Sequence, residues 1–187
     1  MSRFALILCI LLLLASEGRS RRRGPAPDVP AGWNSAALAI HRERGHASYQ
    51  RSRFSQAAEH YRSGFQEALA SGHRHAASRF LLNRANCLFR LNQYQAAVED
   101  YLKAVELAGH EGRVERMAAW LNLSSLYLEL GDVAAAEDSA KRGLALAAAA
   151  NAPRYRPHML AQLGRIRADK EPAAAVRLLE DAYHGDC

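Results

Sequence analysis

The side chains of this sequence that could perform chemistry are scattered histidines and adjacent pairs of acids. His73 and His75 lie two residues apart and could ligate a metal, but no third ligand is close by in the sequence, so solvated loop histidines are expected. Glu99-Asp100 and Glu137-Asp138 could act as paired acids, but consecutive residues of a helix do not face each other. A solvated helix surface is therefore expected at both pairs.

The known catalytic motifs do not occur in the sequence, which has no GxSxG, no P-loop, no GxGxxG after a strand and no HExxH. The three cysteines, Cys9, Cys87 and Cys187, show no CxxC spacing, and their odd number does not form a disulfide framework. Cys87 is expected to be a small buried apolar residue. The sequence thus predicts a protein that is not an enzyme and that binds no metal, no cofactor and no small-molecule substrate.

The formal net charge of +6 is concentrated at the N-terminus. Residues 1–23 hold five arginines and one glutamate, a net of +4, which leaves +2 for all the other residues. A nearly neutral body lacks the basic surface of a nucleic-acid-binding protein, so that class is excluded. The apolar fraction of 49% and the charged fraction of 24% indicate a globular domain.

The N-terminal segment has the layout of a secretory signal, because Arg3 precedes an apolar run over residues 4–15 and small residues follow. Residues 1–18 are therefore expected to be a signal peptide, and the protein is expected to be exported, to the periplasm or the medium. The arginines at 19–23 resist translocation, so a membrane tether through residues 4–15 is the alternative. Residues 19–35, basic and rich in Pro and Gly, are expected to be a linker.

The elements that position the remaining polar side chains are helices arranged in repeats. Four alanines, each at the same place in an apolar pattern, follow one another at steps of 40, 39 and 39 residues: Ala57, Ala97, Ala136 and Ala175. Around the third of them, Trp120, Leu123 and Tyr127 share one helix face, and Gly131-Asp132 provides a helix stop and an N-cap. Each unit is therefore predicted to be helix A, a tight turn and an antiparallel helix B.

These residues resemble the tetratricopeptide-repeat family. The residues that match it are Trp120, Leu123, Tyr127, Gly131, Ala136 and Ala140 in one unit, Leu81, Ala85, Leu88, Asn92, Tyr94, Ala97, Tyr101 and Ala104 in another, and Gly45, Phe54, Ala57 and Tyr61 in the first. The resemblance implies an all-α solenoid of about four repeats over residues 36–187, with units at about 38–77, 78–116, 117–155 and 156–187. The step exceeds the usual 34 or so, which implies longer helices or longer loops.

The resemblance also implies a concave surface built from set positions of the A helices. On this chain the positions are Arg42, His46, Tyr49, Arg79, Leu82, Asn83, Asn86, Phe89, Leu121, Asn122, Ser125 and Leu128. Asn83 and Asn122 fall at equivalent positions, where an amide can bind an extended peptide or only a neighbouring helix. Arg42 and Arg79 can take a carboxylate.

The function expected from the resemblance is a non-enzymatic scaffold or adaptor that binds a peptide or protein segment in the groove. The long step, the Ala-rich B helices and the export signal are also similar to repeat arrays that precede CHAT-type peptidase domains. The alternative is therefore the regulatory or substrate-docking arm of a truncated multidomain enzyme of that type. Leu178, Leu179 and Tyr183 are expected to leave apolar surface at the C-terminal end, where self-association could occur.

Overall fold

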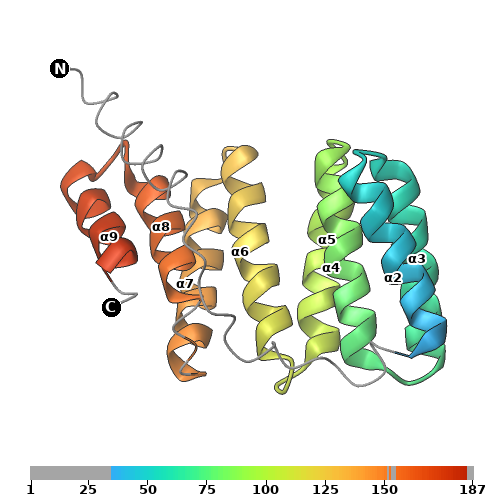
Figure 1. Cartoon of the computed structure of the whole chain (residues 1–187). Helices are drawn as coiled ribbons and strands as arrows, with labels where there is room; N and C mark the ends of the chain where they lie inside the picture. The colour runs from blue at the N-terminus through green and yellow to red at the C-terminus, as the bar shows by residue number, and fades with distance from the viewer. Residues whose placement is uncertain (1–34, 151, 153–154, 185–187) are drawn as a thin grey trace.

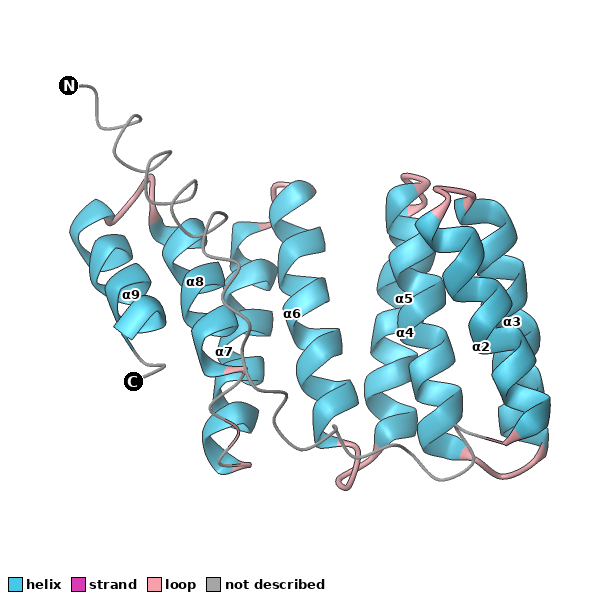
Figure 2. Cartoon of the chain, viewed as in Figure 1, coloured by secondary structure: helices cyan, strands magenta, loops and turns pink. Residues whose placement is uncertain are grey.

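A computed structural model describes residues 35–150, 152 and 155–184, and within them the chain is all helical. Figure 1 shows that the helix pairs follow one another in chain order across the molecule, and Figure 2 shows that helices and short loops account for the described part of the chain. The helices are α2 Ala36–Gln50, α3 Phe54–Ala70, α4 Arg74–Arg90, α5 Tyr94–Ala108, α6 Arg113–Glu129, α7 Val133–Ala149, α8 Arg156–Arg167 and α9 Pro172–His184. The predicted all-α solenoid is confirmed.

The helices form four antiparallel pairs, in which α2, α4, α6 and α8 are the A helices and α3, α5, α7 and α9 are the B helices. The helices of the first three pairs are 15 to 17 residues long. Short turns at 51–53, 71–73, 91–93, 109–112 and 130–132 connect them. The long repeat step therefore comes from long helices, and α4 begins at Arg74, so His75 lies in a helix and not in the expected loop.

The turn from A helix to B helix uses the same backbone geometry in the first three units. Ser52, Asn92 and Gly131 each have a positive φ, of 57°, 59° and 78°, in the left-handed region that ends a helix. The next B helix then begins within two residues, and the Asp132 carboxylate caps α7 by accepting from the Ala135 N–H at 3.0 Å. The predicted helix stop at Gly131 and N-cap at Asp132 are confirmed.

Small side chains allow the helices to approach one another. Ala57, Ala97 and Ala136 are completely buried, and Ala175 is 3% exposed, so the recurring alanine marks the close contact in every unit. Two glycines extend this pattern between units. A Cβ on Gly64 would lie 2.4 Å from the Phe80 ring of α4, and one on Gly143 would lie 2.5 Å from the end of the Met159 side chain of α8.

The A helices form the inner layer of the curved array. Among the A helices, α4 contacts α6 and α6 contacts α8, whereas α2 and α4, like consecutive B helices, do not pack to a comparable extent. Helices on the shorter arc of a curved stack lie closer together, so the A helices line the concave side and the B helices line the convex side. This is the arrangement that the resemblance implied.

Ion pairs join the two layers and correct one expectation. Asp100 is 5% exposed and accepts from Arg84 Nε at 2.6 Å and Nη2 at 2.5 Å, so this acid is not on a solvated surface. Glu137 is half-buried and accepts a hydrogen bond from Arg167 of α8. The hydrogen bonds from Arg167 and Lys141 hold the pKa of the Glu137 carboxyl below its usual range. The expectation of solvated acids was wrong at these two residues because inter-helix arginines reach them.

The hydrophobic core changes along the array. One large cluster runs from Leu38 to Leu126, and two smaller clusters lie between α6, α7 and α8. At the C-terminal end Leu178 packs against the core, whereas Val176 and Tyr183 are more than half exposed. The expectation of uncovered apolar surface is thus confirmed for Tyr183 but was wrong for Leu178 and for Leu179, which packs against Gly164 of α8.

The predicted signal peptide at 1–18 and linker at 19–35 lie almost entirely outside the described residues, which start at residue 35. Within the described helices, none is both long and apolar enough to cross a bilayer.

The two inter-unit glycines give a prediction about packing. Gly64→Ala should destabilise the fold by about 2 kcal/mol, because the added methyl meets the fully buried Phe80 ring and overpacking outweighs the gain in helix propensity. Gly143→Ala should stay within about 0.5 kcal/mol of wild type, because the thioether end of Met159 can move. Urea unfolding followed by circular dichroism measures both changes, and equal losses would show that the Phe80 contact is not rigid.

The ion pairs give a second prediction. Asp100→Asn should cost about 2 kcal/mol, because it leaves the Arg84 guanidinium without its buried, two-pronged partner. Asp138→Asn, which removes the partner of Arg142 in an exposed pair, should cost less than about 0.5 kcal/mol. Thermal unfolding at low and high salt measures the stability lost in each variant. If Asp100→Asn loses as little stability as Asp138→Asn, and if salt reduces that loss, the Arg84–Asp100 pair is not a buried contact.

Candidate functional site

The concave face is best defined where α4 meets α6, because two polar contacts cross between these A helices. Near one end, Arg79 Nε lies 3.1 Å from Glu115 Oε1, and the Glu115 side chain is almost completely buried. Two turns further along α4, the Asn122 amide Nδ2 donates to Asn86 Oδ1 at 3.0 Å. These contacts hold α4 and α6 in a fixed spacing and orientation.

A tyrosine of the B layer supports the second contact. The Tyr101 hydroxyl of α5 donates to the same Asn86 oxygen at 2.5 Å, and burial raises the pKa of the Tyr101 phenol, which keeps it protonated as a donor. Asn86 thus accepts from Tyr101 and from Asn122 at once. Of the two asparagines at equivalent positions, Asn122 is therefore used to join helices.

Asn83 lies between the two contacts. It follows Arg79 by four residues and precedes Asn86 by three, so the three residues share one face of α4. The Asn83 amide is partly exposed and makes no hydrogen bond within the described part of the chain. Its amide therefore offers a donor and an acceptor to whatever lies in the groove.

The predicted arginines and the histidine of the groove have protein contacts of their own. Arg79 is paired with Glu115, and the Arg42 guanidinium lies 3.7 Å from Glu43 Oε1. The His46 ring packs edge-on against the Tyr61 ring, with 5.9 Å between the ring centroids. Partial burial, and to a lesser extent the positive charge of Arg42, lowers the pKa of His46. Arg42 and His46 lie on α2, the A helix of the first unit.

The remaining predicted residues are less polar. Leu82 is buried and belongs to the core, whereas Leu121 is half-buried on α6. The Ser125 hydroxyl donates to the Leu121 carbonyl at 3.2 Å, so it is engaged within its own helix. Sequence reasoning did not find Glu115 as the partner of Arg79, and the only available signal was an acid in the first turn of a predicted A helix.

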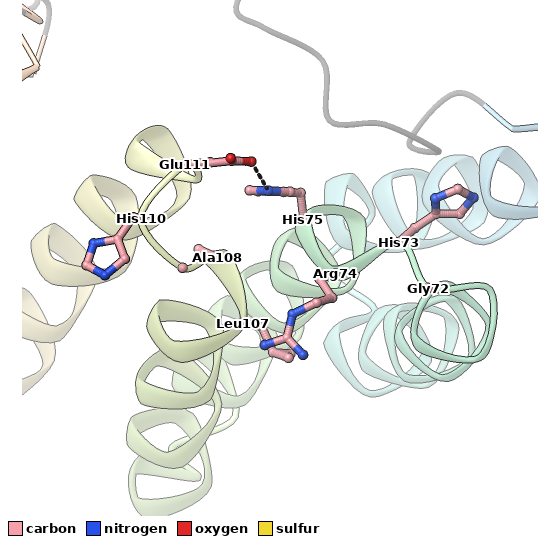
Figure 3. Close-up of a pocket in the computed structure, with 9 residues that line it drawn as sticks. Gly72, His73, Arg74, His75, Leu107, Ala108, His110 and Glu111 are labelled. Atoms are coloured by element: carbon pink, nitrogen blue, oxygen red, sulfur yellow. Dashed lines mark ion pairs between the residues drawn. The ribbon is translucent and has the colours of Figure 1, made fainter.

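A shallow hollow of about 450 Å³ lies along one edge of the array, where the α3–α4 and α5–α6 turns meet, and both His73 of the turn and His75 of α4 line it. Figure 3 shows His75 turned toward Glu111, 3.8 Å away, while His73 points away from that pair. No group of three or more potential metal ligands occurs among the residues that the structure describes. Burial raises the pKa of the Cys87 thiol to about 12, so this cysteine is protonated and enclosed.

The comparisons with known proteins agree with this geometry. The tetratricopeptide-repeat family matches twice, over residues 78–110 and 118–149. No curated protein matches the sequence. Among solved structures, BtubC (BKLC) from P. vanneervenii is similar at a TM-score of 0.70 with 20% identity, over 98% of this chain and 72% of that one.

A second solved structure has the same fold at lower identity. The Rap conjugation gene regulator of the plasmid pLS20, determined in complex with a Phr peptide, is similar at a TM-score of 0.66 with 14% identity. The alignment covers 98% of this chain and 53% of the regulator, so the chain spans about half of that protein. At these identities the two structures show the fold, and the two matched repeats, together with the stacked helix pairs, show that the chain belongs to the tetratricopeptide-repeat proteins.

Proposed function

We propose that this protein is an interaction scaffold that binds an extended peptide or protein segment along the concave face, with the α4–α6 surface as the principal contact. Tetratricopeptide-repeat proteins act in general as interaction scaffolds, which supports the class of function. The observation that carries the finer proposal is the Asn83 amide, which is partly exposed and unengaged between two contacts that fix its surroundings.

The rigidity of the α4–α6 surface favours binding. A segment that enters a pre-formed groove does not have to order the groove, so more of the contact energy appears as affinity. The Arg79–Glu115 pair and the Asn86–Asn122 hydrogen bond provide that order on either side of Asn83. An exposed amide can then donate to a main-chain carbonyl and accept from a main-chain N–H of an extended segment.

A structural neighbour gives independent support for a peptide as the ligand. The Rap regulator, which shares the fold, was determined with a peptide bound. Its low identity means that the residues of its peptide site do not transfer to this chain, so the choice of Asn83 rests on the geometry of α4 alone.

The two asparagines give the test of this proposal. Peptides selected on the wild-type protein from a displayed random library serve as the ligands, and their dissociation constants are measured by calorimetry. Asn83→Ala should weaken binding about tenfold and leave thermal stability unchanged, since the lost amide contacts only the ligand. Asn122→Ala should lower stability by about 1 kcal/mol, since it removes a donor to Asn86.

The matched control is Gln56→Ala, which removes an exposed amide from α3 in the B layer and should change neither affinity nor stability. If Asn83→Ala and Gln56→Ala bind the selected peptides equally well, the α4–α6 surface is not the binding site.

A further inference from the structure

The charges of the array are divided between its two layers. The four A helices carry eleven arginines and three glutamates, a net of +8. The four B helices carry five basic and nine acidic residues, a net of −4. The net charge of the whole chain does not reveal this division, because the B helices offset half of the positive charge of the A helices.

Some of these charges are paired with each other inside the protein. Arg84 and Arg167 of the A layer pair with Asp100 and Glu137 of the B layer, and Arg79 pairs with Glu115. The division persists at the surface, however. The A helices still present six exposed arginines, which are Arg44, Arg74, Arg90, Arg113, Arg156 and Arg165. Only two exposed acids, Glu43 and Glu129, oppose them on these helices.

Three of these arginines occupy the same position in the last three repeats. Arg74, Arg113 and Arg156 are the first residues of α4, α6 and α8, and all three are exposed. Because the A helices run parallel to one another, their first residues lie along the same rim of the concave face; we call these three residues the rim arginines. A cation is unfavourable at a helix N-terminus, so helix stability does not account for their placement.

The spacing of the rim suits an extended chain. Packed helices lie about 10 Å apart, and an extended segment advances about 3.3 Å per residue, so successive rim arginines are about three residues apart along such a segment. Arg74 also borders the hollow between the α3–α4 and α5–α6 turns, where Figure 3 shows its side chain near Leu107. The hollow gives a side chain of the segment room beside the first rim arginine.

The occupant that these charges favour is an acidic protein segment. The chain's own residues 1–34 hold five arginines against Glu17 and Asp28, so the rim would repel them. A second copy offers a B layer whose exposed charges nearly balance, six acids against five cations. Nucleic acids and anionic membranes require clustered cations, whereas here single arginines stand one helix apart.

We propose that the rim arginines and the A-layer charge select an extended, acidic partner segment with carboxylates about every third residue. This inference rests on the proposed function and names its partner class. The positive A layer attracts such a segment at a distance, and each rim arginine then meets one carboxylate as the segment lies across the repeats.

The test compares two charge-reversal variants of the full chain that change the net charge equally. The first is Arg74→Glu with Arg113→Glu and Arg156→Glu, on the rim. The matched control is Arg62→Glu with Lys103→Glu and Arg177→Glu, all exposed on B helices. The probes are labelled twelve-residue peptides, one with Glu at every third position of an Ala/Ser host and one with Lys there. Fluorescence polarisation at 50 and 300 mM salt measures binding, and circular dichroism verifies the fold.

The wild type is expected to bind the Glu peptide and not the Lys peptide, with affinity falling as salt rises. The rim variant should lose at least tenfold in affinity and most of the salt dependence, whereas the B-layer variant should change less than threefold. Equal losses in the two variants, or binding of both peptides alike, would overturn the inference. Tighter rim-dependent binding to phosphatidylserine vesicles or to a twelve-nucleotide RNA would also overturn it, since the occupant would then not be a protein segment.

Asn83→Ala separates this inference from the proposed groove. If library-selected peptides depend on Asn83 but not on the rim arginines, the groove stands and the acidic partner class is wrong. If the Glu peptide depends on the rim arginines but not on Asn83, the charge selection stands and the α4–α6 groove is wrong.

Discussion

The close approach of neighbouring helices at small side chains is the constraint on which the array depends. Ala57, Ala97 and Ala136 have no exposed surface, and Gly64 has no room for a single added carbon beside Phe80. Apolar burial drives the stacking, but its direction and repeat distance follow from where a small residue lets a large one enter. A larger side chain at any of these positions would separate two helices and displace every later unit.

The polar contacts depend on this stacking and make it specific. Arg84 reaches Asp100 only because α4 and α5 lie close, and Asn122 reaches Asn86 only because α4 and α6 do. Each contact satisfies polar or charged groups that would be costly to bury without a partner. A shift of one helix along its neighbour would break the contact, and the free-energy cost of that break exceeds the stability that the intact contact contributes. The same contacts hold the α4–α6 surface rigid, which connects the stability of the array to its proposed use as a binding face.

The candidate site was only partly predictable from the sequence. Repeat spacing placed Asn83 and Asn122 at equivalent positions, but it gave no reason to separate their roles. The structure separates them, because Asn122 donates to an oxygen that also accepts from Tyr101, whereas Asn83 makes no such contact. Asp100 shows the same limit, since a neighbouring acid in the sequence says nothing about an arginine that packing brings from another helix.

The sequence by itself determined the helical repeat, its step, the turn at Gly131-Asp132 and the buried alanines, because these depend on local periodicity, backbone conformation and side-chain size. The tertiary structure decided which polar groups are engaged, which helices form the inner layer, and that the +8 of the A helices lies apart from the −4 of the B helices. Those properties depend on residues that are far apart in the sequence and come within a few ångströms of one another in the fold. Local periodicity in the sequence carries no information about such contacts.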